Sequence, residues 1–473
     1  MLGLLVSGSL LLSACGFQTY TAKPIDPAQT LSRQQSADPE DEAFHQFLIA
    51  QSYPAADFPI RHWGLRELTF AAMFYHPQLS LARAQWRAAQ SAEITAAQRP
   101  LPGLSGGVEN HSETDGGASP WTYSLAIDLP IETAGKRQAR IDRALSLSEA
   151  ARIEIAQNAW QVRSRLASSW IEYNASRLQA AVLQQELTLR QQIVSMLDAR
   201  FEAGMISSVE RSNARLQLQR TEQALEAETN RAPELLAAVA SNAGLPLALA
   251  SQLPLDTANL DTLPGIDHQR KLQRTSGDDI QQAAMLNRLD LRAALARYAA
   301  AEAKLKLEIA RQYPDIVLSP GYSYDQGDRV WSLGIGALMT LLNKNRGLIA
   351  EARALREVEA AQFETLQAKI VGEVAQTKAR YYAALDELDK ARAIRAAQLE
   401  RTARIERQYD AGFADRLELT TTRLENLLAM QSLVNVEYKA QRAANALEDA
   451  IQQPLQDPLS MPANLDQVVE RQP

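Results

Sequence analysis

The chain has 473 residues, a net charge of −7 and 22% charged residues. This mild acidity argues against a nucleic-acid partner, which would require clustered Lys and Arg. Aromatic residues make up only 6%, a composition that suits long helices, and the only cysteine, Cys15, leaves no intrachain disulfide or thiolate metal site.

The first fifteen residues predict a lipoprotein signal. Residues 2–12 are apolar or small, and the run Leu12-Ser13-Ala14-Cys15 resembles a bacterial lipobox. The apolar run is too short to remain as a membrane-spanning helix, so we expect cleavage after residue 14 and acylation of Cys15. The alternative is a buried structural thiol. Residues 15–60, rich in Pro, Gln, Ser and Asp, predict an extended tether after the anchor.

A first repeat is predicted at 61–246. A helical pattern over about 66–99 ends before a proline, and strands follow at about 102–112 and 121–131. A helical hairpin is expected over about 137–245, with its tip at residue 204, because the run holds almost no glycine and no proline before that point.

A second repeat is predicted at 277–455, after a linker at 247–276. Its strands are expected at about 314–325 and 330–341, and its helical hairpin at about 346–453 with the tip at 412. Residues 456–473 would form a C-terminal tail. Gly204 and Gly412 lie 208 residues apart, and at the same offset Tyr173 matches Tyr381 and Pro246 matches Pro454. An uninterrupted register is expected when both copies span the same distance.

The strands alternate between large apolar and small or polar residues, which favours one apolar face. A soluble hairpin would alternate in the same way. If the strands lie in a membrane, the lipid-facing residues are Trp121, Tyr123, Leu125, Ile127, Leu129, Trp331, Leu333 and Ile335. Four strands cannot close a barrel, so three copies would supply one shared barrel of twelve strands and a tunnel of twelve long helices.

The duplicated Ala-Gly turns, the strand starts at Pro102 and Pro314 and the lipobox resemble the TolC-like outer-membrane efflux proteins over about 60–455. The segment 129–137 is more similar to the cation-efflux branch than to the drug branch, and 343–347 is the equivalent corner of the second repeat. The resemblance implies a lipid-anchored homotrimer in the Gram-negative outer membrane. It also implies a mainly helical fold with a barrel sector, and partnership with a periplasmic adaptor and an inner-membrane pump.

The resemblance also assigns roles to the two turns. Their adaptor-docking positions are Ala203, Gly204, Met205, Ile206 and Ser207 in the first turn and Ala411, Gly412, Phe413, Ala414 and Asp415 in the second. Glu210, Glu418 and Tyr409 match the family's periplasmic entrance gate. The alternative, which the sequence favours, is that the two glutamates are solvated acids in the first turn of a helix.

No enzyme is expected, because the sequence holds no phosphate-binding loop, no metalloprotease motif and no nucleophile motif. The five histidines are scattered without ligand spacing, so we expect no metal site and no cofactor. Two alternatives to an efflux channel remain: the outer-membrane duct of a type I protein-secretion system, and a periplasmic coiled-coil structural lipoprotein.

Overall fold

A computed structural model describes residues 18–54, 57–113, 119–258, 277–337 and 343–455. The chain divides into two compact units, Met1–Asp38 and Pro39–Pro473. In the first unit, helix α2 (Pro27–Gln35) begins after Asp26, whose carboxylate accepts a hydrogen bond from the backbone N–H of Ala28 at 2.9 Å. The expected extended tether is therefore helical here. The predicted signal, Cys15 and the tail 456–473 lie outside the described residues.

The second unit begins with an aromatic cluster. Helix α3 (Glu42–Ala50) packs on α4 (Leu65–Tyr75), where the ring of Phe44 lies 5.3 Å from that of Phe74 and 5.5 Å from that of Tyr75. Phe44 is fully buried. The segment expected to be part of a tether is thus folded here, because its apolar residues recur at helical spacing and find an apolar partner in α4.

The rest of the unit repeats one order of elements. The first copy holds α4, α5 (Pro77–Ala97), β1 (Gly103–Asn110), β2 (Trp121–Ile131), α6 (Lys136–Glu202) and α7 (Ser208–Ala243), and the short α8 (Leu247–Ala250) follows it. The second holds α10 (Gly277–Asn287), α11 (Leu289–Ala310), β3 (Ile316–Asp325), β4 (Asp328–Ala337), α12 (Arg346–Asp410) and α13 (Arg416–Ile451). The prediction of a mainly helical chain with two tandem repeats and four strands is confirmed.

The strand bounds differ slightly from the expected ones. Strand β3 begins two residues after Pro314, because Thr133 donates hydrogen bonds to the carbonyl of Pro314 and the carboxylate of Asp315 at the corner before it. Strand β4 begins at Asp328, earlier than expected, since only Gln326 and Gly327 form the turn from β3 and both have positive φ. Residues 338–341 of the predicted strand lie outside the described residues.

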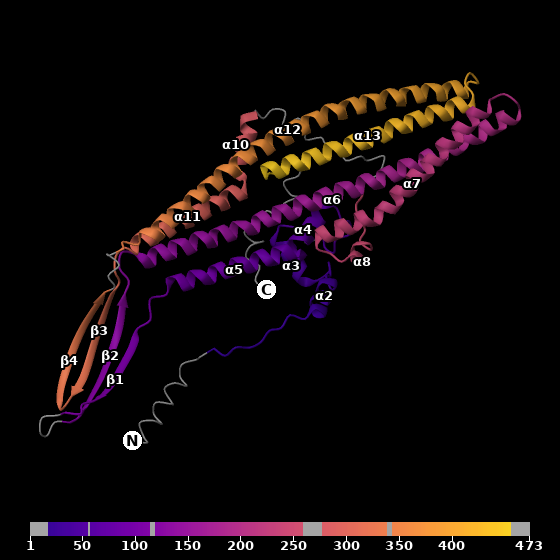
Figure 1. The fold of residues 1–473 in the computed structure, drawn as a ribbon. Helices are drawn as coiled ribbons and strands as arrows, with labels where there is room; N and C mark the ends of the chain where they lie inside the picture. The colour runs from indigo at the N-terminus through magenta and orange to yellow at the C-terminus, as the bar shows by residue number, and fades with distance from the viewer. Residues whose placement is uncertain (1–17, 55–56, 114–118, 259–276, 338–342, 456–473) are drawn as a thin grey trace. The chain divides into compact units, whose positions relative to one another are not determined.

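All four strands form one antiparallel sheet in the order β1-β2-β3-β4 (Figure 1). The central pairing, β2 with β3, joins the two repeats and sets Tyr123 opposite Tyr324 and Ile131 opposite Ile316. Strands β1 and β4 are the two edges of this sheet, and neither has a second neighbouring strand among the described residues.

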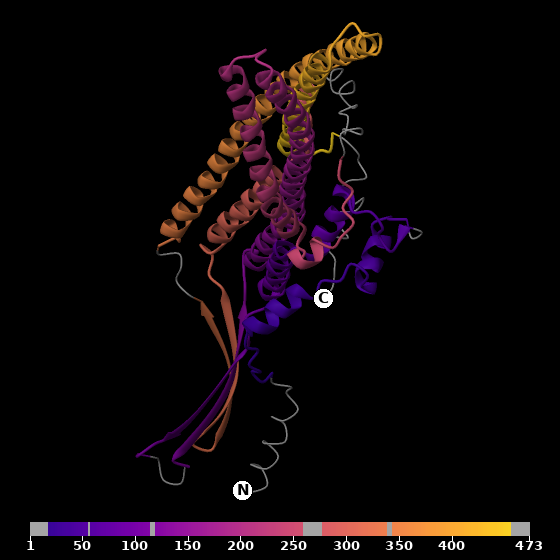
Figure 2. The ribbon, with the colours of Figure 1, turned by 90° about the vertical axis from the view of Figure 1, so that its right-hand side faces the viewer.

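Helix α6 packs against α5, α7, α11 and α13, and α12 packs against α11 and α13. Figure 2 shows the two hairpins, α6–α7 and α12–α13, extending away from the sheet within this unit. A helix of this length, 67 residues for α6, rises about 100 Å. In the described part of the chain, no helix combines the length and hydrophobicity that crossing a bilayer requires.

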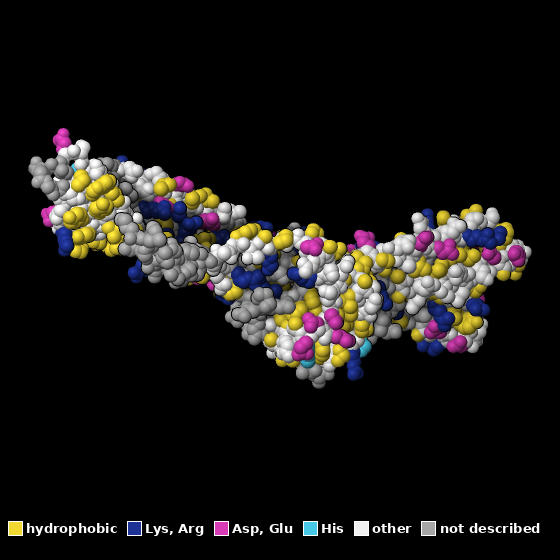
Figure 3. Space-filling model, turned by 90° about the horizontal axis from the view of Figure 1, so that it is seen from below, with side chains coloured by type: hydrophobic (Ala, Val, Ile, Leu, Met, Phe, Trp, Pro, Cys, Tyr) yellow, Lys and Arg dark blue, Asp and Glu magenta, His cyan; other side chains and the backbone are white. Residues whose placement is uncertain are grey.

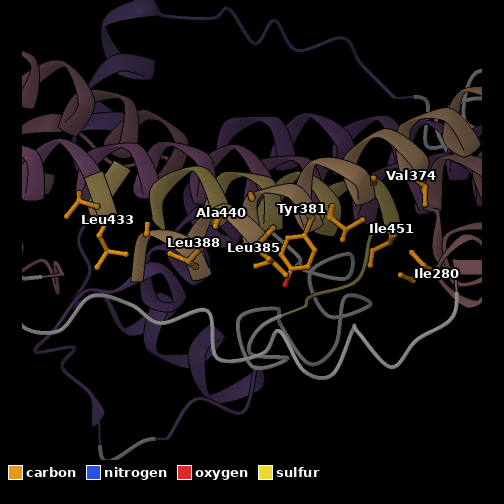
Figure 4. Close-up of a cluster of buried hydrophobic side chains, with 14 of the residues drawn as sticks. Ile280, Val374, Tyr381, Leu385, Leu388, Leu433, Ala440 and Ile451 are labelled. Atoms are coloured by element: carbon orange, nitrogen blue, oxygen red, sulfur yellow. The ribbon is translucent and has the colours of Figure 1, made fainter. Parts of the chain in front are cut away.

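The largest apolar core lies between α12, α13 and α10. Tyr381, Leu385 and Leu388 of α12 point toward Leu433, Ala440 and Ile451 of α13, and Ile280 of α10 covers one end (Figure 4). All of these side chains are buried. This apolar seam, rather than helix propensity, stabilises helices of such length.

A buried ion pair ties α6 to the end of α13. Both terminal guanidinium nitrogens of Arg163 lie 3.1 Å from a carboxylate oxygen of Glu448, and the two side chains are 4% and 7% exposed. Beside them, the indole N–H of Trp160 donates to Asp449 at 3.0 Å. The packing of the first hairpin on the second therefore includes a desolvated charge pair.

Candidate functional site

The first hairpin reverses at residues 203–207. Helix α6 ends at Glu202, and Gly204 has a φ of +73°, the left-handed conformation that closes a helix. The backbone N–H of Gly204 donates to the carbonyl of Phe201 and that of Met205 to the carbonyl of Arg200, both at 2.9 Å. Ser207 caps α7, since its hydroxyl accepts from the N–H of Glu210 at 3.2 Å. The Met205 side chain is 74% exposed.

The second hairpin reverses in the same way. Gly412 has a φ of +78°, and the backbone N–H of Phe413 donates to the carbonyl of Gln408 at 2.8 Å. Asp415 caps α13 by accepting from the N–H of Glu418 at 2.7 Å. The Phe413 side chain is 86% exposed, so each turn presents one large apolar side chain to solvent among small residues. Ile206 and Ala414 are half-buried, while Ala203, Ser207, Ala411 and Asp415 are exposed.

An ion pair joins the two turns within the chain. The guanidinium of Arg200, in the last turn of α6, lies 2.7 Å from the carboxylate of Asp415. Together, the backbone N–H of Glu418 and the Arg200 guanidinium hold the pKa of Asp415 below its ordinary value. Sequence reasoning missed Arg200, because its match in the second repeat is the uncharged Gln408.

A second set of ion pairs was also missed, although a signal for it existed. Asp198 pairs with Arg215 at 2.9 Å across the first turn, and Glu406 pairs with Arg423 at 2.9 Å across the second. Each acid precedes its arginine by 17 residues, and the two pairs lie 208 residues apart. Matching opposite charges at the repeat offset would have found them.

The three predicted gate residues lie close to the turns. Glu210 and Glu418 are exposed and stand in the first turns of α7 and α13, the place where a carboxylate favours a helix N-terminus. Glu418 also lines a groove with Arg401, Asp415 and Glu425. Tyr409 is part-exposed, and its carbonyl accepts from the N–H of Gly412 at 2.9 Å. No described contact brings Glu210 and Glu418 together, so their role at an entrance stays a prediction.

One face of the sheet is mainly apolar, with Asn110 and Arg329 at its loop end. Residues paired directly across strands share a face, and the pairs include Leu125 with Tyr322, Leu318 with Ile335, and Tyr322 with Trp331. Every side chain predicted to face lipid is exposed in the chain: Trp121, Tyr123, Leu125, Ile127, Leu129, Trp331, Leu333 and Ile335. A face this apolar must be covered by lipid or by another protein surface.

The opposite face is polar or small. The hydroxyl of Thr122 donates to the carboxylate of Asp325, and the hydroxyl of Ser319 to that of Asp128, both at 2.5 Å. The remaining residues of this face include Ser105, Gly107, Ser124, Gly321, Ser332 and Gly334. Such a face suits contact with water.

The two repeats of the chain match a known protein family. The model of the outer membrane efflux protein family matches residues 72–244 and 280–452, one match for each repeat. The chain belongs to the outer membrane efflux protein family. This result confirms the family predicted from the turns and strand starts.

Two curated members of the family differ in the cargo that their names describe. The chain is 27% identical over 254 residues to the cobalt-zinc-cadmium resistance protein CzcC of Cupriavidus metallidurans. The aligned region covers 53% of this chain and 57% of CzcC. It is 23% identical to the pyoverdine export outer membrane protein OpmQ of Pseudomonas aeruginosa, over 94% of this chain and 95% of that protein.

Solved structures of outer membrane channels share the fold. VceC of Vibrio cholerae has a TM-score of 0.64 and 20% identity, over 83% of this chain and 97% of VceC. The outer-membrane channel OprN has a TM-score of 0.65 and 19% identity, over 93% and 98%. The fold of this efflux protein is therefore that of an outer membrane channel.

Proposed function

We propose that three copies of this chain form one passive channel through the outer membrane. The observation that carries the proposal is a four-stranded sheet with one exposed apolar face and two unpaired edges, β1 and β4. An unpaired edge in lipid leaves backbone groups without partners at a cost of several kcal/mol each. Pairing β4 of one copy with β1 of the next satisfies both edges and encloses the polar face.

Acylation of Cys15 would attach each copy to the membrane in addition to the barrel. The support is the run Leu12-Ser13-Ala14-Cys15 after an apolar stretch. Each acyl methylene buried in lipid contributes about 0.8 kcal/mol. Loss of the acyl group in a Cys15→Ala variant, seen as a mass change, checks this part alone.

The hairpin turns would receive a periplasmic adaptor that is itself bound to an inner-membrane pump. Small residues around Gly204 and Gly412 leave room for a partner helix to approach, and Met205 and Phe413 offer it apolar contact. The pump would supply the energy, because the family is one of channels. The channel itself would only conduct.

Metal cations are the proposed cargo. The likeness to CzcC and the corner segment 129–137 favour cations. A second candidate is an organic chelator or other small organic solute, favoured by the likeness to OpmQ over nearly the whole chain.

The test compares a deletion strain with the same strain carrying the gene, on panels of divalent metals and of organic toxins. Sensitivity limited to metals in the deletion strain supports cation export. Sensitivity limited to organic compounds overturns it in favour of the second candidate, and no sensitivity on either panel contradicts both.

A further inference from the structure

The end of the sheet next to the helices, here called the helix end, has two corners where strands connect to helices. Both corners are rich in Lys and Arg side chains. At the first corner, Lys136 donates from Nζ to the carboxylate of Asp315 and to the carbonyl of Tyr313, both at 2.7 Å. Arg140 pairs with Glu132, and Arg137 donates to the carbonyl of Ala97 at 2.7 Å. These contacts fix the strand-to-helix connections.

The second corner is held in the same way by a buried acid. Glu308 is 1% exposed and accepts from Arg311 at 2.8 Å and from the side-chain amide of Asn345 at 3.1 Å. Hydrogen bonds from Asn345, Lys304 and Arg311 outweigh its burial and hold the pKa of Glu308 below its ordinary value. The acids of both corners are thus already occupied by cations of the fold.

Four further cations at these corners have no acidic partner among the described residues. Arg99, Arg143, Lys344 and Arg346 are exposed, and none of them forms an ion pair with any residue in the described ranges. Asp142, the remaining acid between residues 131 and 143, is hydrogen-bonded to the amide of Gln138. The four cations therefore outnumber Asp142, and the helix end of the sheet carries a net positive charge.

The two ends of the sheet differ in charge. Near the hairpin loops, the described residues Glu109, Glu113, Asp325 and Asp328 outnumber the single cation Arg329. The sheet therefore carries mainly acids at its loop end and mainly cations at its helix end.

Exposed apolar residues adjoin the four cations. Leu101 is 87% exposed and Tyr313 is 57% exposed, each directly beside a corner, and Ile131 ends the apolar face at the same level. Figure 3 shows hydrophobic side chains gathered over the strand end and a group of Lys and Arg side chains next to them. Apolar surface followed at once by cations and an exposed tyrosine is the order of contacts at a bilayer surface.

We propose that Arg99, Arg143, Lys344 and Arg346 bind the phosphate groups of anionic phospholipids at the helix end of the sheet. The inference rests on the proposed membrane channel, since it places the adjoining apolar face in the acyl region. Because Arg and Lys near a membrane surface attract anionic headgroups, the four cations set the depth at which the sheet sits.

The test titrates the purified trimer with phosphatidylglycerol and with phosphatidylcholine and counts bound lipids by native mass spectrometry. A variant with Arg99, Arg143, Lys344 and Arg346 each changed to Gln is compared with a control in which Arg220, Arg380, Lys390 and Arg404 are changed to Gln. The control residues are exposed helical cations that also lack ion pairs, so both variants lose the same charge.

We expect the wild type and the control to prefer phosphatidylglycerol and the quadruple corner variant to lose that preference, with each substitution weakening phosphatidylglycerol binding about fivefold. Equal binding of the two lipids by the wild type, or an equal loss in both variants, overturns the inference. If the quadruple variant does not assemble, the single substitution Lys344→Gln decides by the same criteria. A protein that never forms a membrane-inserted trimer refutes the channel proposal instead, which separates the two failures.

Discussion

Gly204 and Gly412 show at the scale of one residue how sequence sets the turns. Both have positive φ, and nothing lies within 4 Å of the position that a Cβ would occupy. Their place was predictable, because each interrupts a long helical run and is followed by a capping Ser or Asp. A side chain at either position would point into open space, where we propose the adaptor approaches.

Gly412→Arg is expected to abolish export while the channel still assembles. The left-handed conformation costs a side chain only about 1–2 kcal/mol, too little to unfold two packed helices, whereas the arginine would block close approach of a partner. Gly412→Asn is the matched control, because Asn tolerates this conformation and is smaller. Export is measured with the cargo found on the panels. Normal export by Gly412→Arg would contradict the docking role of this turn.

Other residues could not be paired from sequence. The ion pairs of Arg200 with Asp415 and Lys136 with Asp315 join residues more than 170 positions apart, and neither is repeated in the other half. Their geometry depends on how the two hairpins pack, which periodicity does not specify. The ion pair of Arg163 with Glu448 could not be predicted from sequence for the same reason.

Arg163→Ala is expected to destabilise the protein by about 3–5 kcal/mol, because the carboxylate of Glu448 would stay buried and lose both guanidinium hydrogen bonds. Arg423→Ala is the control, since the pair of Arg423 with Glu406 is about half exposed and is expected to contribute at most about 1 kcal/mol. Thermal unfolding of the detergent-solubilised protein, followed by circular dichroism, compares the two. Equal losses of Tm would show that the buried pair is not important for stability.

At the scale of elements, the helical hairpins were predicted closely and the N-terminal segment was not. Helices α6 and α12 end at equivalent residues, Glu202 and Asp410, yet they begin at Lys136 and Arg346, so the repeat offset changes by two at the corner. Residues 42–50 form α3 because Phe44 finds partners in α4, and composition alone could not show that contact. Strand β2 was predicted with its observed bounds, since alternation is strongest there.

The sheet permits a direct test of its two faces. Leu333→Arg places a charge on the apolar face and is expected to cost about 2–4 kcal/mol if that face meets lipid. Ser332→Arg, the neighbouring residue on the polar face of the same strand, is expected to assemble normally. The amount of trimer in outer-membrane fractions gives the result. Equal assembly of both variants would mean that neither face contacts lipid.

At the scale of the whole molecule, the proposal is that one chain does not close a barrel by itself. Among the described residues, its sheet has two unpaired edges, β1 and β4, while the family is that of outer membrane efflux proteins and the fold is shared with the channel OprN. In the proposed channel, the number of copies would follow from closure of the barrel, which sequence predicts only through the count of strands. The proposed pump and entrance would decide what passes through, and neither can be derived from this sheet.

The most direct test is the mass and conductance of the detergent-solubilised protein. Native mass spectrometry is expected to give three chains of 52.1 kDa, less the signal and plus any acyl chains, and the same preparation should form ion-conducting pores in a planar bilayer. A monomer that stays in solution without detergent and conducts nothing would contradict the account. It would favour a periplasmic coiled-coil lipoprotein instead.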